Sequence, residues 1–320
     1  METYESIKKW KDETMSSYIQ TSASLNEFHD QVMLKVLNVA TGKMKRPKPP
    51  CEYTWFITGS GGRFEQGLIS DQDHGIIYEI SNEENDNYFK DLGEEISYGM
   101  NCTGYPYCNG KIMSSNPIWR KSLVDWKNQL NYWMENEKWE SIRYLQIFYD
   151  ARVLYGNTDY LNELKAIIYN YQLQHPSLLQ RFIANVKHIK NVIGPMGQIL
   201  VEQHGVYQGC VNLKYSAFLP YVNAIRLLSI KEGIFETSTI ERIERLQEKD
   251  EYKNMLLFCK ENFITLTKYR LSLLNAQNYD DTHYLNIKNL SKEQRKELKQ
   301  IFKCGKRLHE EVIELTFTKN

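Results

Sequence analysis

The sequence predicts an α+β protein: a small mixed β-sheet with flanking helices, followed by an all-α helical bundle. The segments predicted to be strands, rich in β-branched and aromatic residues, lie between residues 53 and 155. Apolar residues at helical spacing dominate from about residue 158 onward. A chain of 320 residues usually exceeds one core. We therefore expect an N-terminal helical segment (1–45), a mixed α/β domain (46–160) and a helical domain (161–320).

The expected elements follow from residue spacing and from turn residues. One helix is predicted over 1–43, because valines recur at helical spacing, and the basic, proline-rich run 43–50 ends it. Further along, the pattern predicts strands at 53–58, 73–80 and 146–155. Between them we expect a short helix at 65–68, a partly helical segment at 81–96, an ordered loop at 101–118 and a tryptophan-bearing helical stretch from Trp119 to Trp139. Later helices are predicted at 178–193, at 211–230 with a kink at Pro220, and at 291–316, where Ser291 opens a capping box.

Charge and cysteine usage limit the class of protein. Lysine plus arginine and aspartate plus glutamate number 40 each, so there is no basic surplus, which disfavours a nucleic-acid polymerase or tailing enzyme. We find neither a signal-peptide pattern nor an apolar run that could span a membrane, and we expect a cytoplasmic protein. The six cysteines form no CxxC pair, so they are expected to be reduced thiols, and zinc is not expected.

A glycine-rich corner follows the first predicted strand. Gly59-Ser60-Gly61-Gly62 is the kind of segment whose backbone N–H groups can approach phosphate oxygens. Arg63 adds a positive charge with several donors. Alone, such a run is more often a flexible turn, so the interpretation depends on what lies beside it.

Two carboxylates follow this corner. Asp71 and Asp73 are two residues apart at the start of a predicted strand, so both are expected to face the same spot. Paired carboxylates repel each other unless a cation lies between them, and oxygen ligands select Mg²⁺ or Mn²⁺. A phosphate cradle beside such a pair predicts phosphoryl or nucleotidyl transfer, with two metal ions roughly 4 Å apart.

This order of residues resembles the polymerase-β-like nucleotidyltransferase superfamily, whose signature is Gly-Ser or Gly-Gly followed by Asp-x-Asp. The finer pattern, from Gly59 to Glu65 with Ser70-Asp71-x-Asp73, is similar to protein-PII uridylyltransferases and glutamine-synthetase adenylyltransferases. It most resembles bacterial signal-transduction nucleotidyltransferases that are often fused to CBS domains. Further stretches that match this family are Cys108–Met113 with Asn116-Pro117-x-Trp119, Tyr149–Gly156, Asn212–Arg226 and 291–317.

The resemblance implies a role for each candidate residue. Asp71, Asp73 and, as third carboxylate, Asp150 would bind the metal ions and act in catalysis. Nucleotide binding would fall to Gly59, Ser60, Gly62, Arg63, Ser70, Arg152 and Lys214. Simpler interpretations stay open: Asp150 and Arg152 can form a surface salt bridge, and Lys214 and Arg226 can be ordinary helix-surface residues. His74 is expected to be structural, and Cys102 and Cys108 to be packed thiols.

The reaction that the resemblance implies is transfer of a nucleoside monophosphate from an NTP, ATP or UTP, to a protein or small-molecule acceptor, with release of pyrophosphate. An antibiotic- or metabolite-modifying enzyme would use the same metal site. The alternative class is a catalytically silent regulatory or scaffold protein that binds Mg-nucleotide as a signal. Helical bundles with tryptophan-rich faces often dimerise, so a homodimer is one state to test.

Overall fold

The computed structural model describes residues 2–317 and confirms the predicted class: a four-stranded mixed sheet with flanking helices, and a largely helical remainder. The chain divides into two compact units, the first extending to Tyr171 and the second starting at Gln172. It passes from one to the other within the helix α7 (Thr158–Gln174).

The first unit is built around a sheet of four strands in the order β3-β2-β1-β4. The strands are β1 (Tyr53–Ile57), β2 (His74–Tyr78), β3 (Arg120–Ser122) and β4 (Arg152–Gly156). The central strand β1 pairs antiparallel with β2 and β4, and β2 pairs parallel with β3. The helices are α1 (Tyr4–Thr14), α2 (Ser22–Lys43), α3 (Gly59–Gly62), α4 (Glu83–Cys102), α5 (Leu123–Asn136) and α6 (Trp139–Tyr149), with the 3₁₀ turn η1 (Met15–Ser17).

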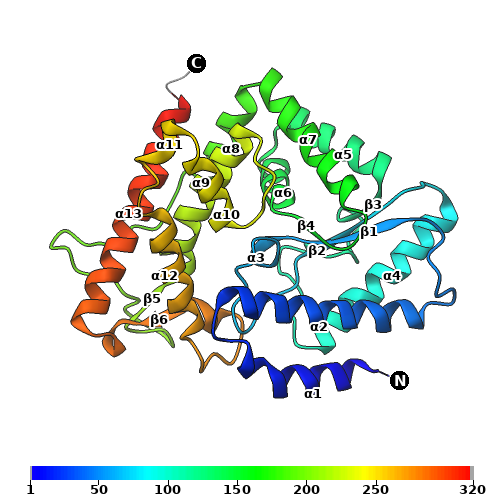
Figure 1. The fold of residues 1–320 in the computed structure, drawn as a ribbon, viewed down its shortest axis with the longest axis horizontal. Coiled ribbons are helices and arrows are strands. Elements are labelled where there is room, and N and C mark those ends of the chain that lie inside the picture. The colour runs from blue at the N-terminus through cyan, green and yellow to red at the C-terminus, as the bar shows by residue number, and fades with distance from the viewer. Residues whose placement is uncertain (1, 318–320) are drawn as a thin grey trace. The chain divides into compact units, whose positions relative to one another are not determined.

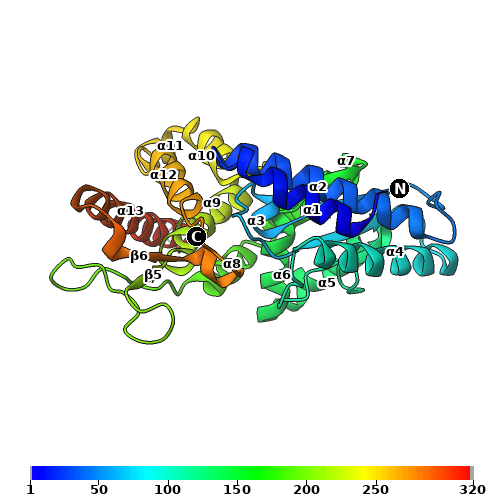
Figure 2. The same ribbon diagram turned by 90° about the horizontal axis from the view of Figure 1, so that it is seen from below.

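Both faces of the sheet are covered, which explains why β1 is buried throughout. Alternate residues Tyr53, Trp55 and Ile57 join the core that α2 and α4 complete. Phe56 points to the opposite face, where its ring lies 5.8 Å from those of Trp126 on α5 and Phe148 on α6. Figures 1 and 2 show α1 and α2 side by side along one side of this sheet. The unit is therefore a layered α/β structure.

The second unit is mainly helical. Its elements are α8 (Ser177–Val186), α9 (Leu219–Glu232), α10 (Thr239–Gln247), α11 (Asp250–Lys253), α12 (Cys259–Leu271) and α13 (Lys292–Phe317), the π-helix η2 (Lys214–Phe218), the 3₁₀ turns η3 (Asp280–His283) and η4 (Ile287–Asn289), and the antiparallel strands β5 (Cys210–Asn212) and β6 (Tyr284–Asn286).

The helix α9 forms the centre of the second unit, because its residues are buried from Pro220 to Ile230 and α10 and α13 pack against it. Gly305 lets α13 approach closely: a Cβ atom there would lie 2.6 Å from the Tyr221 ring, whose hydroxyl donates to the Ile301 carbonyl. The capping box predicted at Ser291 is confirmed, since Ser291 and Gln294 exchange hydrogen bonds.

Several predicted boundaries were wrong, each for a local reason. The helix expected over 1–43 is two helices, because Thr21 caps a new helix through a reciprocal pair of bonds with Ser24. The segment predicted as a strand over 146–155 is helical up to Tyr149, and β4 starts at Arg152. The helix expected over 211–230 opens instead with β5 and η2, and Pro220 lies near the start of α9 rather than at a kink.

The helix expected at 65–68 is absent, and the glycines themselves form the short helix α3. Backbone groups of the segment after Arg63 bond to α2 instead: the Gln66 N–H donates to Asn26 Oδ1 at 3.0 Å, and the Gly67 carbonyl accepts from His29 Nε2 at 3.0 Å. Because these groups are satisfied by a neighbouring helix, the segment has no need of helical bonds of its own.

Candidate functional site

The glycine corner joins the ends of β1 and β2. The Thr58 N–H donates to the Asp73 carbonyl at 2.9 Å, which continues the pairing of the two strands by one residue. The chain then turns through Gly59, whose φ is +59°. A Cβ atom on residue 59 would lie 2.2 Å from Asp73 Oδ2. Both the backbone angle and the close carboxylate therefore require glycine at this position.

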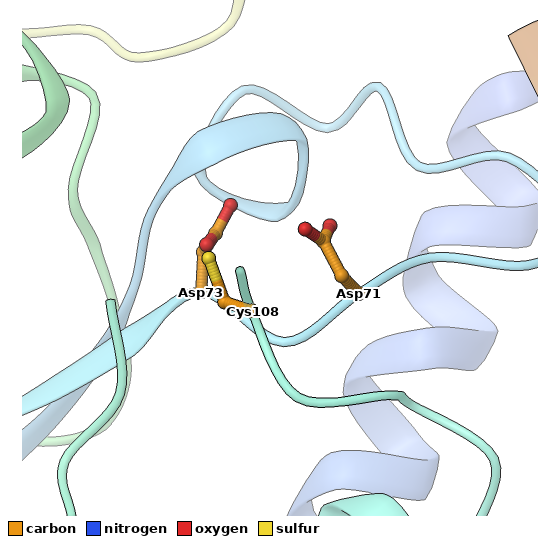
Figure 3. Close-up of side chains that lie close together, drawn as sticks. All are labelled: Asp71, Asp73 and Cys108. Carbon is orange, nitrogen blue, oxygen red and sulfur yellow. The ribbon is translucent and has the colours of Figure 1, made fainter. Parts of the chain in front are cut away.

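The two predicted carboxylates converge, and a thiol joins them. One oxygen of Asp71, one of Asp73 and the Cys108 sulfur all lie within 4.8 Å of one another. Figure 3 shows the three side chains beneath the α3 turn, with Asp71 pointing toward the other two. Both aspartates precede β2 rather than belong to it, because the strand starts at His74. The predicted convergence of the pair is nevertheless present.

Gln72 lies between the two aspartates and His74 follows them, and the buried hydrogen bonds of both side chains hold this segment in place. Gln72 is buried, and its amide donates to the carbonyls of Ser97 and Tyr105 at 3.1 and 3.0 Å. His74 is bound to the Gln72 Oε1 at 2.9 Å and accepts from the Trp55 indole at 3.2 Å. Burial lowers the pKa of His74 to about 3. His74 is thus a neutral structural group, as its sequence position indicates.

Cys108 is the site residue that sequence reasoning missed. It lies on the loop between α4 and β3, which is held in place where the His74 N–H donates to the Ile112 carbonyl at 3.0 Å. The pKa of the Cys108 thiol is raised, chiefly by burial and further by the charge of Asp73. The only signal in the sequence was the run from Cys108 to Met113, whose cysteine we interpreted as a packed thiol.

Arg63, directly after α3, lies within a largely buried ion-pair network. Its Nη1 lies 2.8 Å from Asp150 Oδ2, and its Nε lies 2.8 Å from Glu65 Oε2. Burial acts to lower the pKa of Arg63, but the charges of Glu65 and Asp150 outweigh it and raise that pKa. Asp150 ends α6 and is buried, and a Cβ atom on Gly62 would lie 2.1 Å from its carbonyl oxygen.

Arg152 supports the same corner from β4. Its Nε donates to the Gly61 carbonyl at 3.0 Å, and its two terminal nitrogens hold Asp30 on α2 at 2.8 and 2.6 Å. The guanidinium lies 3.8 Å from the centre of the Phe64 ring. Asp30 was another residue that sequence reasoning missed, because only the folded chain brings α2 to this corner.

The remaining predicted residues divide between the two units. The Ser60 and Ser70 hydroxyls lie 3.5 Å apart beside the corner, and Ser70 also donates to the Asp71 carbonyl at 3.1 Å. Lys214 belongs to the second unit, at the start of η2.

No helix within residues 2–317 is both long and apolar enough to cross a membrane.

Comparison with known proteins agrees with this geometry. Residues 8–140 match the family model described as putative nucleotidyltransferase DUF294, and residues 176–314 match the model described as putative nucleotidyltransferase substrate binding domain. No curated protein matches the chain. The first match includes the glycine corner, both aspartates and Cys108, and the second includes Lys214.

Proposed function

We propose a reaction for this chain from one premise, that it belongs to the nucleotidyltransferase family DUF294. In this reaction a nucleoside monophosphate passes from an NTP, ATP or UTP, to a protein or small-molecule acceptor, and pyrophosphate leaves. The observation that carries the proposal is the convergence of Asp71 and Asp73 beside the Gly59 corner. A regulatory acceptor would place the protein in signal transduction in the cytoplasm.

The donor set suits a divalent cation. Two carboxylates within 4.8 Å of each other repel unless a cation neutralises them, and their oxygens are ligands that Mg²⁺ and Mn²⁺ accept. A bound cation would supply charge neutralisation for the triphosphate and the leaving pyrophosphate. Cys108 distinguishes the site from an all-oxygen one, because a cysteine sulfur is a softer ligand than the oxygens that Mg²⁺ and Mn²⁺ prefer.

The chain's own residues would orient the nucleotide around this pair. The tight turn from Gly59 to Gly62, with Ser60 and Ser70 beside it, would hold phosphate oxygens through N–H and hydroxyl groups. Arg152 would position the turn through the Gly61 carbonyl, and any contact with the nucleotide would be additional. Lys214 would contact the triphosphate from the substrate-binding unit.

The third carboxylate decides between two candidate functions. Asp150 is proposed to complete the catalytic set, which requires it to exchange its bond with Arg63 for a metal ion when nucleotide binds. The ion pair with Arg63 favours the second candidate, a protein that binds Mg-nucleotide without transferring it. In that case Asp150 would serve only to hold Arg63 in place.

Labelled transfer tests the proposal. The protein is incubated with Mg²⁺ or Mn²⁺ and each NTP labelled at the α-phosphate, with a cell extract as acceptor. We expect an acceptor to be labelled. The double variant Asp71→Asn/Asp73→Asn should abolish this labelling, whereas the control Asp91→Asn, at an exposed position, should leave it intact. Labelling that persists in the double variant refutes the site. Metal-dependent nucleotide binding without transfer in any extract supports the silent candidate.

A further inference from the structure

The neutral total charge of the chain conceals an asymmetry between its two units. Up to Tyr171 the sequence carries 18 Lys and Arg against 24 Asp and Glu, whereas from Gln172 it carries 22 against 16. The unit that holds the carboxylate pair is therefore net negative, and the other is net positive. A net positive unit attracts anionic ligands.

Part of this positive charge is gathered around two aromatic rings of the second unit. Lys214 Nζ lies 3.3 Å from the Tyr279 hydroxyl and 5.2 Å from the centre of its ring. The ring of His283 meets that of Tyr279 edge-on, with centroids 4.7 Å apart. Phe218, at the other end of η2, lies 5.2 Å from the Arg270 guanidinium. Lys214 and His283 thus share one ring, Tyr279, while Arg270 lies against Phe218 and is close enough to His283 for its charge to act on that imidazole.

His283 has unused hydrogen-bonding capacity. Its side chain is 5% exposed, and among the described residues its buried Nε2 has no hydrogen-bond partner. Burial, followed by the charges of Arg270 and Lys214, lowers the pKa of His283 to about 2. A buried polar atom without a partner costs free energy, and so do neighbouring like charges. An anion bound here would relieve both costs.

We propose that Lys214, Arg270 and His283 form a phosphate-binding subsite in the second unit. Phosphate fits because it is anionic and presents several acceptor oxygens to lysine and arginine donors. The phosphate can come from the triphosphate of a nucleotide or from a phosphorylated acceptor. The choice of the nucleotide as source rests on the proposed function, whereas the subsite itself rests on the cluster.

Calorimetry with tripolyphosphate on the full chain in EDTA tests the subsite without metal and without transfer. We expect tripolyphosphate to bind, with an affinity that falls as the salt concentration rises. Lys214→Gln and Arg270→Gln should each lower this affinity about tenfold. Lys268→Gln is the matched control, because Lys268 is exposed on α12, the helix that carries Arg270, and its loss changes the net charge equally. Circular dichroism confirms that each variant is folded.

Two further ligands identify the source of the phosphate. Competition by ATP, with affinity that rises from inorganic phosphate to tripolyphosphate, assigns the subsite to a nucleotide tail. Equal affinity for inorganic phosphate assigns it to a phosphorylated acceptor. The proposal is overturned if tripolyphosphate does not bind, or if Lys214→Gln, at a half-buried position, binds it as the unaltered protein does. Either result would remove the proposed phosphate contact of Lys214, but label transfer that depends on Asp71 and Asp73 would still be expected, so the reaction and the subsite are tested separately.

Discussion

A Cβ atom on residue 59 would lie 2.2 Å from Asp73 Oδ2, so the glycine corner and this carboxylate fit together only because Gly59 has no side chain. The same residue has a φ of +59°, which a side chain disfavours. The spacing between Gly59 and Asp73 therefore couples the proposed phosphate cradle to the proposed metal ligand: displacing either moves the other.

Gly59→Ala should damage metal and nucleotide binding together. The new methyl group would push Asp73 away from Asp71 and strain the backbone, which we expect to cost about 1–3 kcal/mol of stability and at least about tenfold in Mn²⁺ affinity. Gly61→Ala is the control, because its nearest neighbours, atoms of Gln66 and Ile57, lie at 3.4–3.5 Å. Equal Mn²⁺ affinity in the two variants would contradict the coupling.

Cys108 should make the site sensitive to thiophilic ions. Cd²⁺ is expected to bind with a sulfur-to-metal absorption band in the ultraviolet and to release the thiol proton, because the raised pKa of Cys108 keeps the thiol protonated beforehand. Cys108→Ser should remove the band and weaken Cd²⁺ binding about tenfold or more. Cys102→Ser, also half-buried, should retain both. A band that survives Cys108→Ser would place the cadmium elsewhere.

How far the sequence predicts this site depends on how local each feature is. The strand, the glycine corner and the Asp-x-Asp spacing lie within one short segment, so Gly59, Asp71 and Asp73 were identified correctly as neighbours. Cys108 comes from a loop 35 residues beyond Asp73 in the sequence. Its position depends on the buried bonds of Gln72 and on the pairing of His74 with Ile112, which spacing alone does not reveal.

The prediction mistook a helix for a strand in a segment whose aromatic residues are compatible with both. The run from Gln146 to Tyr155 was predicted to be one strand because it is β-branched and aromatic. In the structure Ile142, Leu145, Phe148 and Tyr149 are buried at helical spacing, so tertiary packing overrides local propensity. Asp150 consequently caps a helix instead of lying on a strand face, and its partner is Arg63.

Asp150→Asn should be more destabilising than removal of all three charges of the network that Asp150 forms with Arg63 and Glu65. The single change leaves the Arg63 guanidinium, which is 12% exposed, with Glu65 alone, and we expect a loss of about 3 kcal/mol. Adding Arg63→Met and Glu65→Gln to Asp150→Asn removes all three charges and should recover part of that loss, as measured by urea denaturation. Additive losses in the triple variant would show that the three residues are not coupled.

Mn²⁺ affinity of the same variant separates the two roles of Asp150. If Asp150 is a metal ligand, Asp150→Asn lowers Mn²⁺ affinity by about tenfold or more at temperatures where the variant is folded. Asp30→Asn is the comparison, because it also breaks a carboxylate–arginine pair beside the corner but lies on α2. Equal Mn²⁺ affinity in both variants would assign Asp150 a structural role.

Two buried histidines should make the first unit sensitive to mild acid. His29 lies between the Tyr105 hydroxyl at 2.8 Å and the Gly67 carbonyl at 3.0 Å, and His74 lies between Trp55 and Gln72. A carbonyl can only accept, so His29 Nε2 donates and Nδ1 accepts from the tyrosine, which is the pattern of a neutral ring. Burial lowers the pKa of each histidine to about 3.

The sign of the effect follows from where the proton binds. Below about pH 6.5 the unfolded chain protonates both rings while the folded protein does not, so acid favours unfolding. Stability should be independent of these rings above pH 6.5 and should fall between about pH 6.5 and 3 by up to about 1.4 kcal/mol per pH unit for each ring. Urea denaturation between pH 6.5 and 5 measures this slope before most carboxylates titrate. His29→Gln should reduce the slope by one ring's share, whereas His188→Gln, at an exposed position, should leave it unchanged. An unchanged slope in His29→Gln would mean that this ring is already protonated in the folded protein, contrary to its bonds with Tyr105 and Gly67.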